Sequence, residues 1–177
     1  MQKFERADFE VKEYVESENY GKFVLSPLER GFGTTIGNAL RRVLLSSLPG
    51  AAVFSIKVDG VYHEFTTIPG IREDVSIIIL QLKQLVMTIE DDDVYDLQIS
   101  AKGPCTITAG DIICPAQVEI LNKDLEIAHL EKDVTLEMEL KAKNGRGYVS
   151  ADINKQLNQG ASQGIGTVYT DSIYTPI

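Results

Sequence analysis

The chain has 177 residues, of which 44% are hydrophobic, and its 17 basic and 26 acidic side chains give a formal net charge of −9. This length suits one large domain or two small ones, with enough apolar side chains for a buried core. The negative charge argues against direct binding to nucleic acid, which relies on lysine and arginine side chains that neutralise phosphates.

Other features of the composition exclude further classes of protein. The first residues are charged and no apolar run reaches the length of a membrane span, so we expect a cytoplasmic protein without membrane contact. Cys105 and Cys114 lack C-x-x-C spacing and form no metal-ligand pattern with His63 and His129. We therefore expect two reduced thiols, with neither a metal nor a cofactor.

The first part of the chain is organised around a Gly-rich turn and a helix. Alternating apolar residues predict strands near 9–14 and over 20–25, and a helix is predicted over 35–48. A Pro-Gly pair ends this helix. The glycines between 31 and 37 allow a tight turn and the close approach of a neighbour.

This helix is predicted to have two different faces. At about 100° per residue, one side carries an apolar stripe formed by Ile36, Ala39, Leu40, Val43, Leu44 and Ser47. Leu45 falls on the opposite side, flanked by Arg41 and Arg42. Arginines around a large apolar side chain are typical of protein–protein contacts. The alternative is a single exposed leucine beside solvated arginines, which is common on protein surfaces.

After the helix, alternation predicts a strand over 52–58. The Asp-Gly pair that follows predicts a hairpin into a second strand over 61–65. Apolar residues at helical spacing then predict a second helix near 72–86.

From residue 90 onward the sequence is rich in short β segments. Regular alternation over 134–140 predicts a half-buried strand. The residues at 144–147 predict a turn, those at 156–166 a polar, Gly-rich loop, and those at 168–174 a last strand.

Two motifs are compatible with catalysis. The turn from Gly31 to Gly37 precedes a helix, and helix N-termini bind phosphates. Its spacing differs from the dinucleotide fingerprint and no βαβ pattern follows, so a nucleotide-binding enzyme using this turn is the alternative function. Asp91, Asp92 and Asp93 are consecutive and point in different directions, which favours a solvated turn over a metal site.

Several runs of the sequence resemble one protein family. The run LSPLERGFGTTIGNALRRVLLSSLPGAAV is similar to the assembly helix of the bacterial RNA polymerase alpha subunit, N-terminal domain. The likeness continues in VDGVYHEFTTIPGIREDV, TAGDI, GRGYVSAD and DSIYTPI, and so covers nearly the whole chain.

The resemblance implies an α+β fold in two parts. Residues 1–50 would belong to a dimerisation subdomain, and residues 51–177 would form an inserted, mainly β subdomain. The implied function is that of a scaffold that forms an alpha homodimer and docks the beta and beta-prime subunits for DNA-templated transcription. By this resemblance the catalytic metal belongs to the larger subunits, and we expect no catalytic residue in this chain.

The resemblance also implies roles for individual residues. Those facing the second alpha copy or the subdomain core would be Phe32, Thr35, Ile36, Ala39, Val43 and Ser47. Those meeting beta, or beta-prime in the other copy, would be Glu29, Arg30, Arg41, Arg42, Leu45 and Arg146. On sequence grounds Arg146 could also be the tip of a simple hairpin turn.

In the family, the chain continues beyond DSIYTPI with a further strand and helix of the dimerisation subdomain and then a DNA-binding domain. We therefore expect no promoter contact by these 177 residues. We also expect residues 1–50 to be looser than 51–177, with self-association through the apolar stripe of the helix. A stand-alone adaptor outside the polymerase is a third possibility, and it would bind a different partner.

Overall fold

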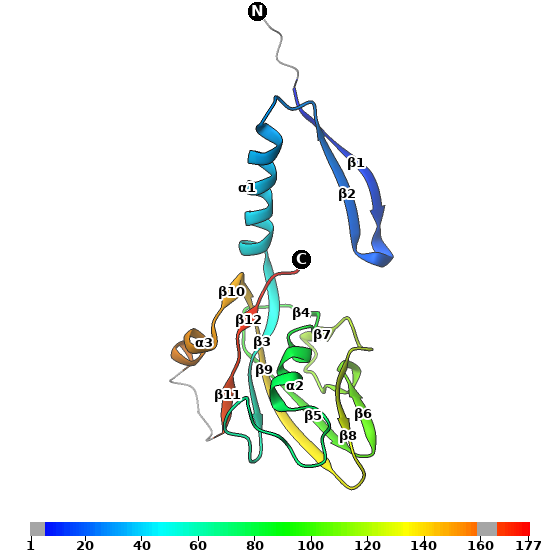
Figure 1. Ribbon diagram of the computed structural model, residues 1–177, viewed down its shortest axis with the longest axis vertical. Helices are drawn as coiled ribbons and strands as arrows, with labels where there is room; N and C mark the ends of the chain where they lie inside the picture. Colours follow the sequence, from blue (N-terminus) through cyan, green and yellow to red (C-terminus); the bar gives the residue numbers. More distant parts are fainter. Residues whose placement is uncertain (1–5, 159–165) are drawn as a thin grey trace, which may run out of the picture. The chain divides into compact units, whose positions relative to one another are not determined.

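The computed structural model describes residues 6–158 and 166–177. Its helices and antiparallel sheets confirm the predicted α+β class (Figure 1). The chain divides into two compact units, Met1–Val43 and Leu44–Ile177, and the boundary falls within helix α1 (Phe32–Ser46). The assignment of residues 1–50 to a dimerisation subdomain stays a prediction.

The first unit contains an antiparallel hairpin and the larger part of α1. Strands β1 (Asp8–Val15) and β2 (Tyr20–Ser26) are joined through the 3-10 turn η1 (Glu16–Glu18). The rings of Phe9 and Phe23 stack on one face of the hairpin, with centroids 5.3 Å apart. None of the described residues of this unit is buried, so its apolar side chains form no core of their own.

Helix α1 begins at Phe32, earlier than predicted, and ends at Ser46. Gly31 has a φ of 94°, which glycine adopts without steric cost. The N–H of Phe32 donates to the carbonyl of Glu29 at 3.1 Å, so the tight turn runs directly into the helix. The sequence predicts a close neighbour at the glycines, but among the described residues no atom outside the adjacent residues and the helix's own backbone lies within 4 Å of a Cβ built on Gly37.

The second unit is built on a four-stranded antiparallel sheet. Its strand order is β11-β3-β9-β5, with bounds Thr167–Tyr169, Pro49–Val58, Thr135–Arg146 and Tyr95–Lys102. In β9, alternate side chains from Leu136 to Ala142 are buried, while Glu137 and Glu139 are exposed. The half-buried strand predicted from this alternation is therefore confirmed.

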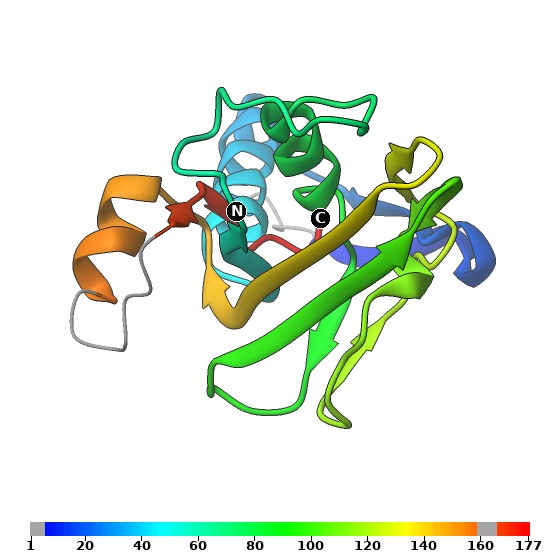
Figure 2. The same cartoon turned by 90° about the horizontal axis from the view of Figure 1, so that it is seen from below.

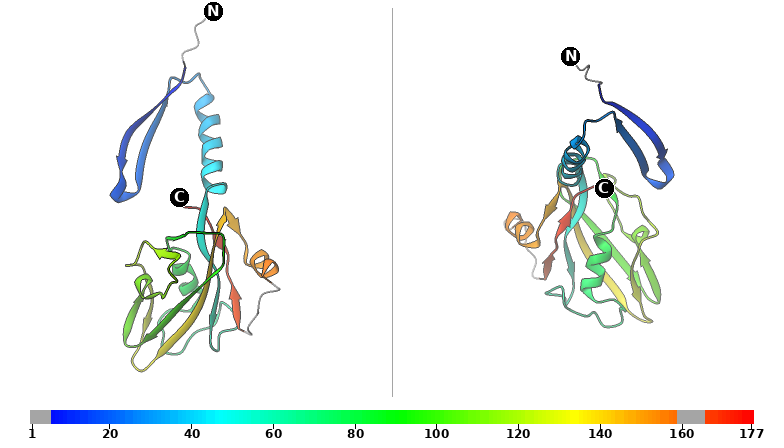
Figure 3. Two further views of the ribbon diagram at one scale, coloured as in Figure 1. Left: turned by 180° about the vertical axis from the view of Figure 1, so that it is seen from behind. Right: turned by 45° about the horizontal axis from the view of Figure 1, so that its top comes forward.

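Shorter elements accompany the sheet. The two-stranded ribbons are β4 (Met87–Ile89) with β7 (Val118–Ile120), β6 (Cys105–Thr108) with β8 (Glu126–Leu130), and β10 (Tyr148–Val149) with β12 (Ser172–Ile173). The helical elements are α2 (Val75–Leu82), η2 (Ala109–Asp111) and α3 (Ala151–Leu157). Figure 2 shows α2 against one face of the sheet, and Figure 3 shows α3 beside β11 and β12.

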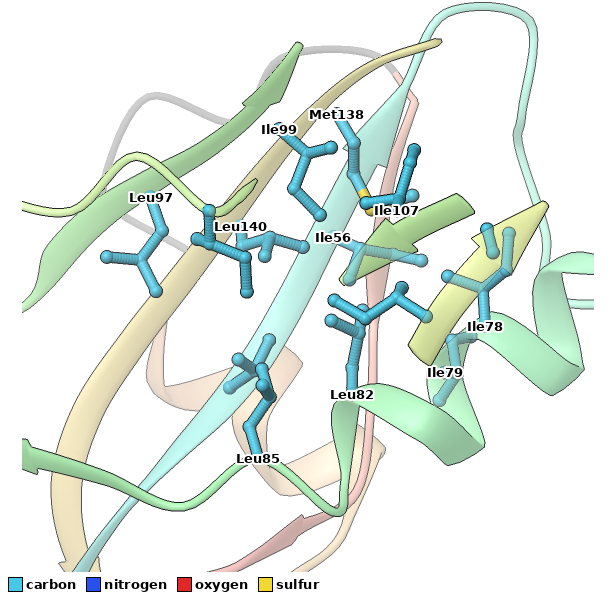
Figure 4. Packing of buried hydrophobic residues seen from close by; sticks show 14 of the residues in the cluster. Ile56, Ile78, Ile79, Leu82, Leu85, Leu97, Ile99, Ile107, Met138 and Leu140 are labelled. Atoms are coloured by element: carbon cyan, nitrogen blue, oxygen red, sulfur yellow. The ribbon is translucent and has the colours of Figure 1, made fainter. Parts of the chain in front are cut away.

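The core of the second unit lies between the sheet and α2 (Figure 4). Leu82 of α2 points toward Ile56 of β3, and Leu97 and Leu140 of the neighbouring strands belong to the same cluster. These four side chains are at most 3% exposed. Burying an aliphatic side chain of this size is worth about 1.5–3 kcal/mol, so this cluster accounts for much of the stability of the unit.

The structure corrects the hairpin predicted after the Asp-Gly turn. Residues 61–65 form no strand. The N–H of Val61 donates to the carbonyl of Val58 at 3.1 Å, and its side chain is 2% exposed within the core. Because this side chain is buried, the chain turns inward after the Asp-Gly pair and does not pair with β3. The strands that pair with β3 are β9 and β11 instead.

Helix boundaries also differ from the prediction. Helix α2 is shorter than the predicted range because Asp74 is extended, with a ψ of 157°, and the chain turns at Lys83. Helix α3 is not predicted by the sequence reasoning, and only its last two residues fall in the region expected to be a Gly-rich loop. Residues 159–165 of that predicted loop lie outside the described residues.

The predicted last strand is divided into β11 and β12. Between them, the N–H of Thr170 donates to the carbonyl of Phe54 at 2.9 Å, and the carboxylate of Asp171 accepts a hydrogen bond from the N–H of Ala151. The chain thereby leaves β3 and pairs with β10 instead.

Candidate functional site

Helix α1 exposes the whole apolar stripe that the sequence predicts. Leu40 is 55% exposed, Val43 51% and Leu44 41%, and no residue of the helix is buried. Of the residues assigned to the dimer contact, Phe32, Thr35, Ala39, Val43 and Ser47 are exposed and Ile36 is half-buried. A row of large apolar groups exposed to water is unusual for a surface helix.

The opposite face of α1 carries the residues assigned to the large-subunit contact. The helix runs without interruption from Phe32 to Ser46, so Arg41, Arg42 and Leu45 share one side of it. Leu45 is 39% exposed and both arginines are exposed. The structure forms the helix on which the two predicted faces would lie, and the roles of those faces stay a prediction. Glu29 and Arg30, in the turn before the helix, are exposed as well.

Arg146 lies at the end of β9, next to the C-terminal end of α1. Pro49 and Arg146 are register partners in the β3–β9 ladder. A Cβ built on Gly147, which has a φ of 63°, would lie 3.3 Å from the carbonyl oxygen of Ser46. Of the predicted contact residues, the structure therefore brings Arg146 close to the end of the helix that carries Leu45.

Two glycines, one in β3 and one in β9, leave room on the sheet for the C-terminal segment. Gly50 and Gly145 are register partners, and Tyr174 packs against both. A Cβ on Gly145 would lie 2.7 Å from Cγ of the Tyr174 ring, and a Cβ on Gly50 would collide with the Tyr174 backbone. Both positions therefore exclude larger residues, because moving backbone or a buried ring to make room would destabilise the fold.

The acidic turn at 90–93 is held against the same strand ends. Asn144 donates from Nδ2 to the carbonyls of Ile89 at 3.0 Å and Asp91 at 2.6 Å. Asp91 accepts hydrogen bonds from the Tyr95 hydroxyl at 2.6 Å and from the N–H of Asp93 at 3.0 Å. These bonds lower the pKa of Asp91. The hydrogen bond from the Tyr95 hydroxyl to the Asp91 carboxylate raises the pKa of Tyr95 to about 12. The solvated turn predicted here is confirmed, but its attachment through Asn144 is not evident from sequence.

Helix α3 is anchored through polar groups that the sequence reasoning misses. Buried Asn154 donates from Nδ2 to the carbonyl of Thr170 at 2.8 Å and to Oγ of Ser172 at 3.0 Å. Asp171 accepts from the N–H of Ala151, and this bond, together with nearby Lys83, lowers the pKa of the carboxyl against the effect of burial. An available signal was Ser150, whose hydroxyl accepts from the N–H of Ile153 as an N-cap.

Large apolar side chains and guanidinium groups are both exposed on α1. Within residues 6–158 and 166–177, no group of three or more acidic, histidine or cysteine side chains could hold a metal ion. In the same part of the chain, no helix is both long enough and apolar enough to span a membrane.

Comparison with protein families gives a specific match. A model of the RNA polymerase Rpb3/RpoA insert domain matches residues 56–175, which is more than half of the chain. The chain belongs to this family. The matched residues contain most of the second unit, with the end of β3, the other three strands of its central sheet, α2 and α3.

Curated relatives agree with the match. The chain is 52% identical over all 177 residues to the DNA-directed RNA polymerase subunit alpha of Alkaliphilus metalliredigens (strain QYMF), and covers 55% of that protein. The same values hold for the subunit of Desulfitobacterium hafniense (strain DSM 10664 / DCB-2). Against that of Oenococcus oeni (strain ATCC BAA-331 / PSU-1), identity is 57% over 162 residues, covering 92% of this chain and 51% of the relative.

The chain spans about half the length of the curated relatives it matches. The resemblance to the bacterial alpha subunit is confirmed by these matches. A nucleotide-binding enzyme using the turn from Gly31 to Gly37 is not supported, because both the matched family and the relatives are polymerase subunits.

Proposed function

We propose that this chain is a non-catalytic scaffold of a bacterial RNA polymerase, working in the cytoplasm as the N-terminal part of an alpha subunit. One face of α1 joins two alpha copies, and the opposite face docks the beta subunit, or beta-prime in the second copy. The observation that carries this proposal is that α1 exposes large apolar side chains on opposite faces. The chain itself contacts neither nucleic acid nor membrane.

The dimer contact is supported by the stripe and by the glycines next to it. Gly33 and Gly37 are one helical turn apart, and among the described residues no atom outside the adjacent residues and the helix's own backbone lies within 4 Å of a Cβ built on either. Glycine inside a helix costs about 1 kcal/mol relative to alanine. Two such residues on an exposed surface are explained if a neighbouring helix approaches closely there. Phe32, Ile36 and Val43 would then be buried between the two copies.

The contact with beta is supported by the composition of the opposite face. Interface hot spots are enriched in arginine and cluster near the desolvated centre of the interface. On α1 this centre is Leu45, with Arg41 and Arg42 beside it. Arg146 extends the contact, because β9 ends next to the C-terminal residues of the helix.

A capture experiment with purified beta tests the proposal. We expect Arg42→Ala to weaken beta binding by about 2 kcal/mol or more, as for a hot-spot arginine. Its free energy of unfolding should change by no more than about 0.5 kcal/mol, because Arg42 is exposed. Lys132→Ala, which removes an exposed cation from the β8–β9 turn, serves as the control. Equal capture by wild type and Arg42→Ala would remove this face from the contact, and no capture by wild type would refute the scaffold.

A further inference from the structure

A group of buried polar side chains lies in the second unit where α3 meets β12 (Figure 3). Asn154 of α3 is 0% exposed, and both Ser172 of β12 and Tyr174, which follows this strand, are 1% exposed. Asn154 is the only buried residue of α3, whereas the apolar Ile153 and Leu157 of the same helix are exposed. The helix is therefore anchored by a polar side chain, and the polar atoms buried with it need hydrogen-bond partners.

Most hydrogen-bonding groups of this cluster are paired. Asn154 uses both hydrogens of Nδ2, on the carbonyl of Thr170 at 2.8 Å and on Oγ of Ser172 at 3.0 Å. The Ser172 hydroxyl donates its one hydrogen to the carbonyl of Val53 at 3.1 Å. Neither side chain has a hydrogen left for another acceptor, but Oγ of Ser172 keeps one lone pair that can accept a second bond.

Two atoms of the cluster have no partner among the described residues, and they are of opposite kinds. The Tyr174 hydroxyl has a hydrogen to donate, and Oδ1 of Asn154 can only accept. Burial raises the pKa of the Tyr174 hydroxyl and the nearby Ser172 hydroxyl opposes this, although the two do not meet with the geometry of a hydrogen bond. Ser172 is thus a common neighbour of both side chains.

The groups left over define what could satisfy them. A ligand must accept one hydrogen bond from a phenol and donate one to an amide oxygen. It must be neutral, because the three side chains are uncharged and a buried charge among them would be costly. It must also be small, because the side chains around it are almost fully buried. A water molecule meets these conditions, and it can donate its second hydrogen to Oγ of Ser172. Buried waters typically make about three such bonds.

We infer that one water molecule is enclosed between α3 and the C-terminal segment, where it bridges the Tyr174 hydroxyl to Oδ1 of Asn154. The ring of Tyr174 packs on Gly50 of β3 and Gly145 of β9. The bridge therefore ties α3 to the central sheet through the segment that follows β12. This inference does not depend on the proposed function, since it concerns contacts within the second unit alone.

A high-resolution crystal structure of the wild-type chain tests the site directly. We expect electron density for one water within about 2.7–3.2 Å of both the Tyr174 hydroxyl oxygen and Oδ1 of Asn154. A direct hydrogen bond between these two atoms would overturn the inference. The absence of density, or density that contacts only one of the two atoms, would overturn it as well.

Removal of the phenol hydroxyl tests the same bond in solution. Tyr174→Phe keeps the ring and should lower the folding equilibrium constant about fivefold, the usual loss for one hydrogen bond. An unpaired hydroxyl would give the opposite result, because its removal deletes a desolvated group and leaves the variant as stable as wild type or more stable. Tyr62→Phe is the matched control: it removes the same atom from a side chain that is 69% exposed and should leave the constant unchanged. Urea denaturation measures all three proteins.

The loss must also depend on Asn154. In the background of Asn154→Leu, which removes the acceptor at similar side-chain volume, Tyr174→Phe should change the equilibrium constant by less than about twofold, because the two side chains act through one water. A fivefold loss that persists in this background would show that the hydroxyl has another partner, and the bridge would be refuted. The crystal structure uses the wild-type chain, so it decides the question even if Asn154→Leu does not fold.

Discussion

The hairpin and α1 carry large apolar side chains that stay in contact with water, whereas the same kinds of residue in the second unit form a dense core. Phe9, Phe23 and Leu40 are all more than half exposed, while Ile56 and Leu140 are at most 1% exposed. The difference shows which part of the chain packs its apolar side chains into a core of its own and which part leaves them exposed. A helix of this length is marginal in water without tertiary packing, and no residue of α1 is buried.

The largest effect that this comparison predicts is in amide hydrogen exchange. Residues 35–43 of α1 should exchange at least about 100-fold faster than residues 136–142 of β9, because only the strand opens by global unfolding. Raising the protein concentration should slow exchange in α1 and leave β9 unchanged, since association covers the apolar stripe. Equal protection of both segments in a dilute monomer would contradict the comparison.

The next effect concerns two leucines in the two environments. Leu140→Ala removes a side chain with 0% exposure and should lower the free energy of unfolding by about 2–5 kcal/mol. Leu40→Ala removes the same atoms from a position that is 55% exposed and should change it by about 0.5 kcal/mol or less. Urea denaturation followed by circular dichroism measures both. Similar losses for the two variants would mean that α1 is packed within the isolated chain.

Much of this contrast could be predicted from sequence, because it depends on local periodicity. The alternation in β9 is a repeating pattern and is found as expected. The helix predicted from the spacing in α1 is also found, but none of its residues is buried, so its two faces stay a prediction. The Asp-Gly turn was also found, but the strand predicted after it was not. The turn is a local signal, whereas the direction of the chain after it depends on the burial of Val61 in a core assembled from distant strands.

The candidate site shows the same limit. Arg41, Arg42 and Leu45 lie within one helical turn, so spacing is sufficient to group them. Arg146 lies near the end of this helix because of the β3–β9 register, and Asn144 is bonded to a turn more than 50 residues away in sequence. The Asn-Gly pair at 144 is read locally as a turn, and nothing in the local pattern shows that its side chain is needed elsewhere.

The smallest predicted effect is a pH dependence within the second unit. Glu73 accepts hydrogen bonds from the backbone N–H of His129 and interacts with its ring Nδ1, both at 2.7 Å. Burial raises the pKa of the Glu73 carboxyl, but the bonds from His129 together outweigh it and leave that pKa below its usual value. A pKa that is lower in the folded state stabilises the fold above the unfolded value, about 4.3. That stabilisation is lost as the pH falls through the folded pKa.

Glu73→Gln should therefore lower the free energy of unfolding by about 1 kcal/mol near pH 6, the usual contribution of one hydrogen bond. The difference in unfolding free energy between wild type and Glu73→Gln should shrink as the pH is lowered from about 5 toward 3. In that range Glu73 of the wild type becomes protonated and loses the negative charge that the variant also lacks. Glu126→Gln is the matched control: its carboxylate lies 3.8 Å from Nε2 of the same histidine but is 68% exposed, and such surface pairs contribute little. Urea denaturation at several pH values measures all three proteins. If Glu73→Gln keeps the acid sensitivity of wild type, Glu73 does not link the loop before α2 to β8 through its charge.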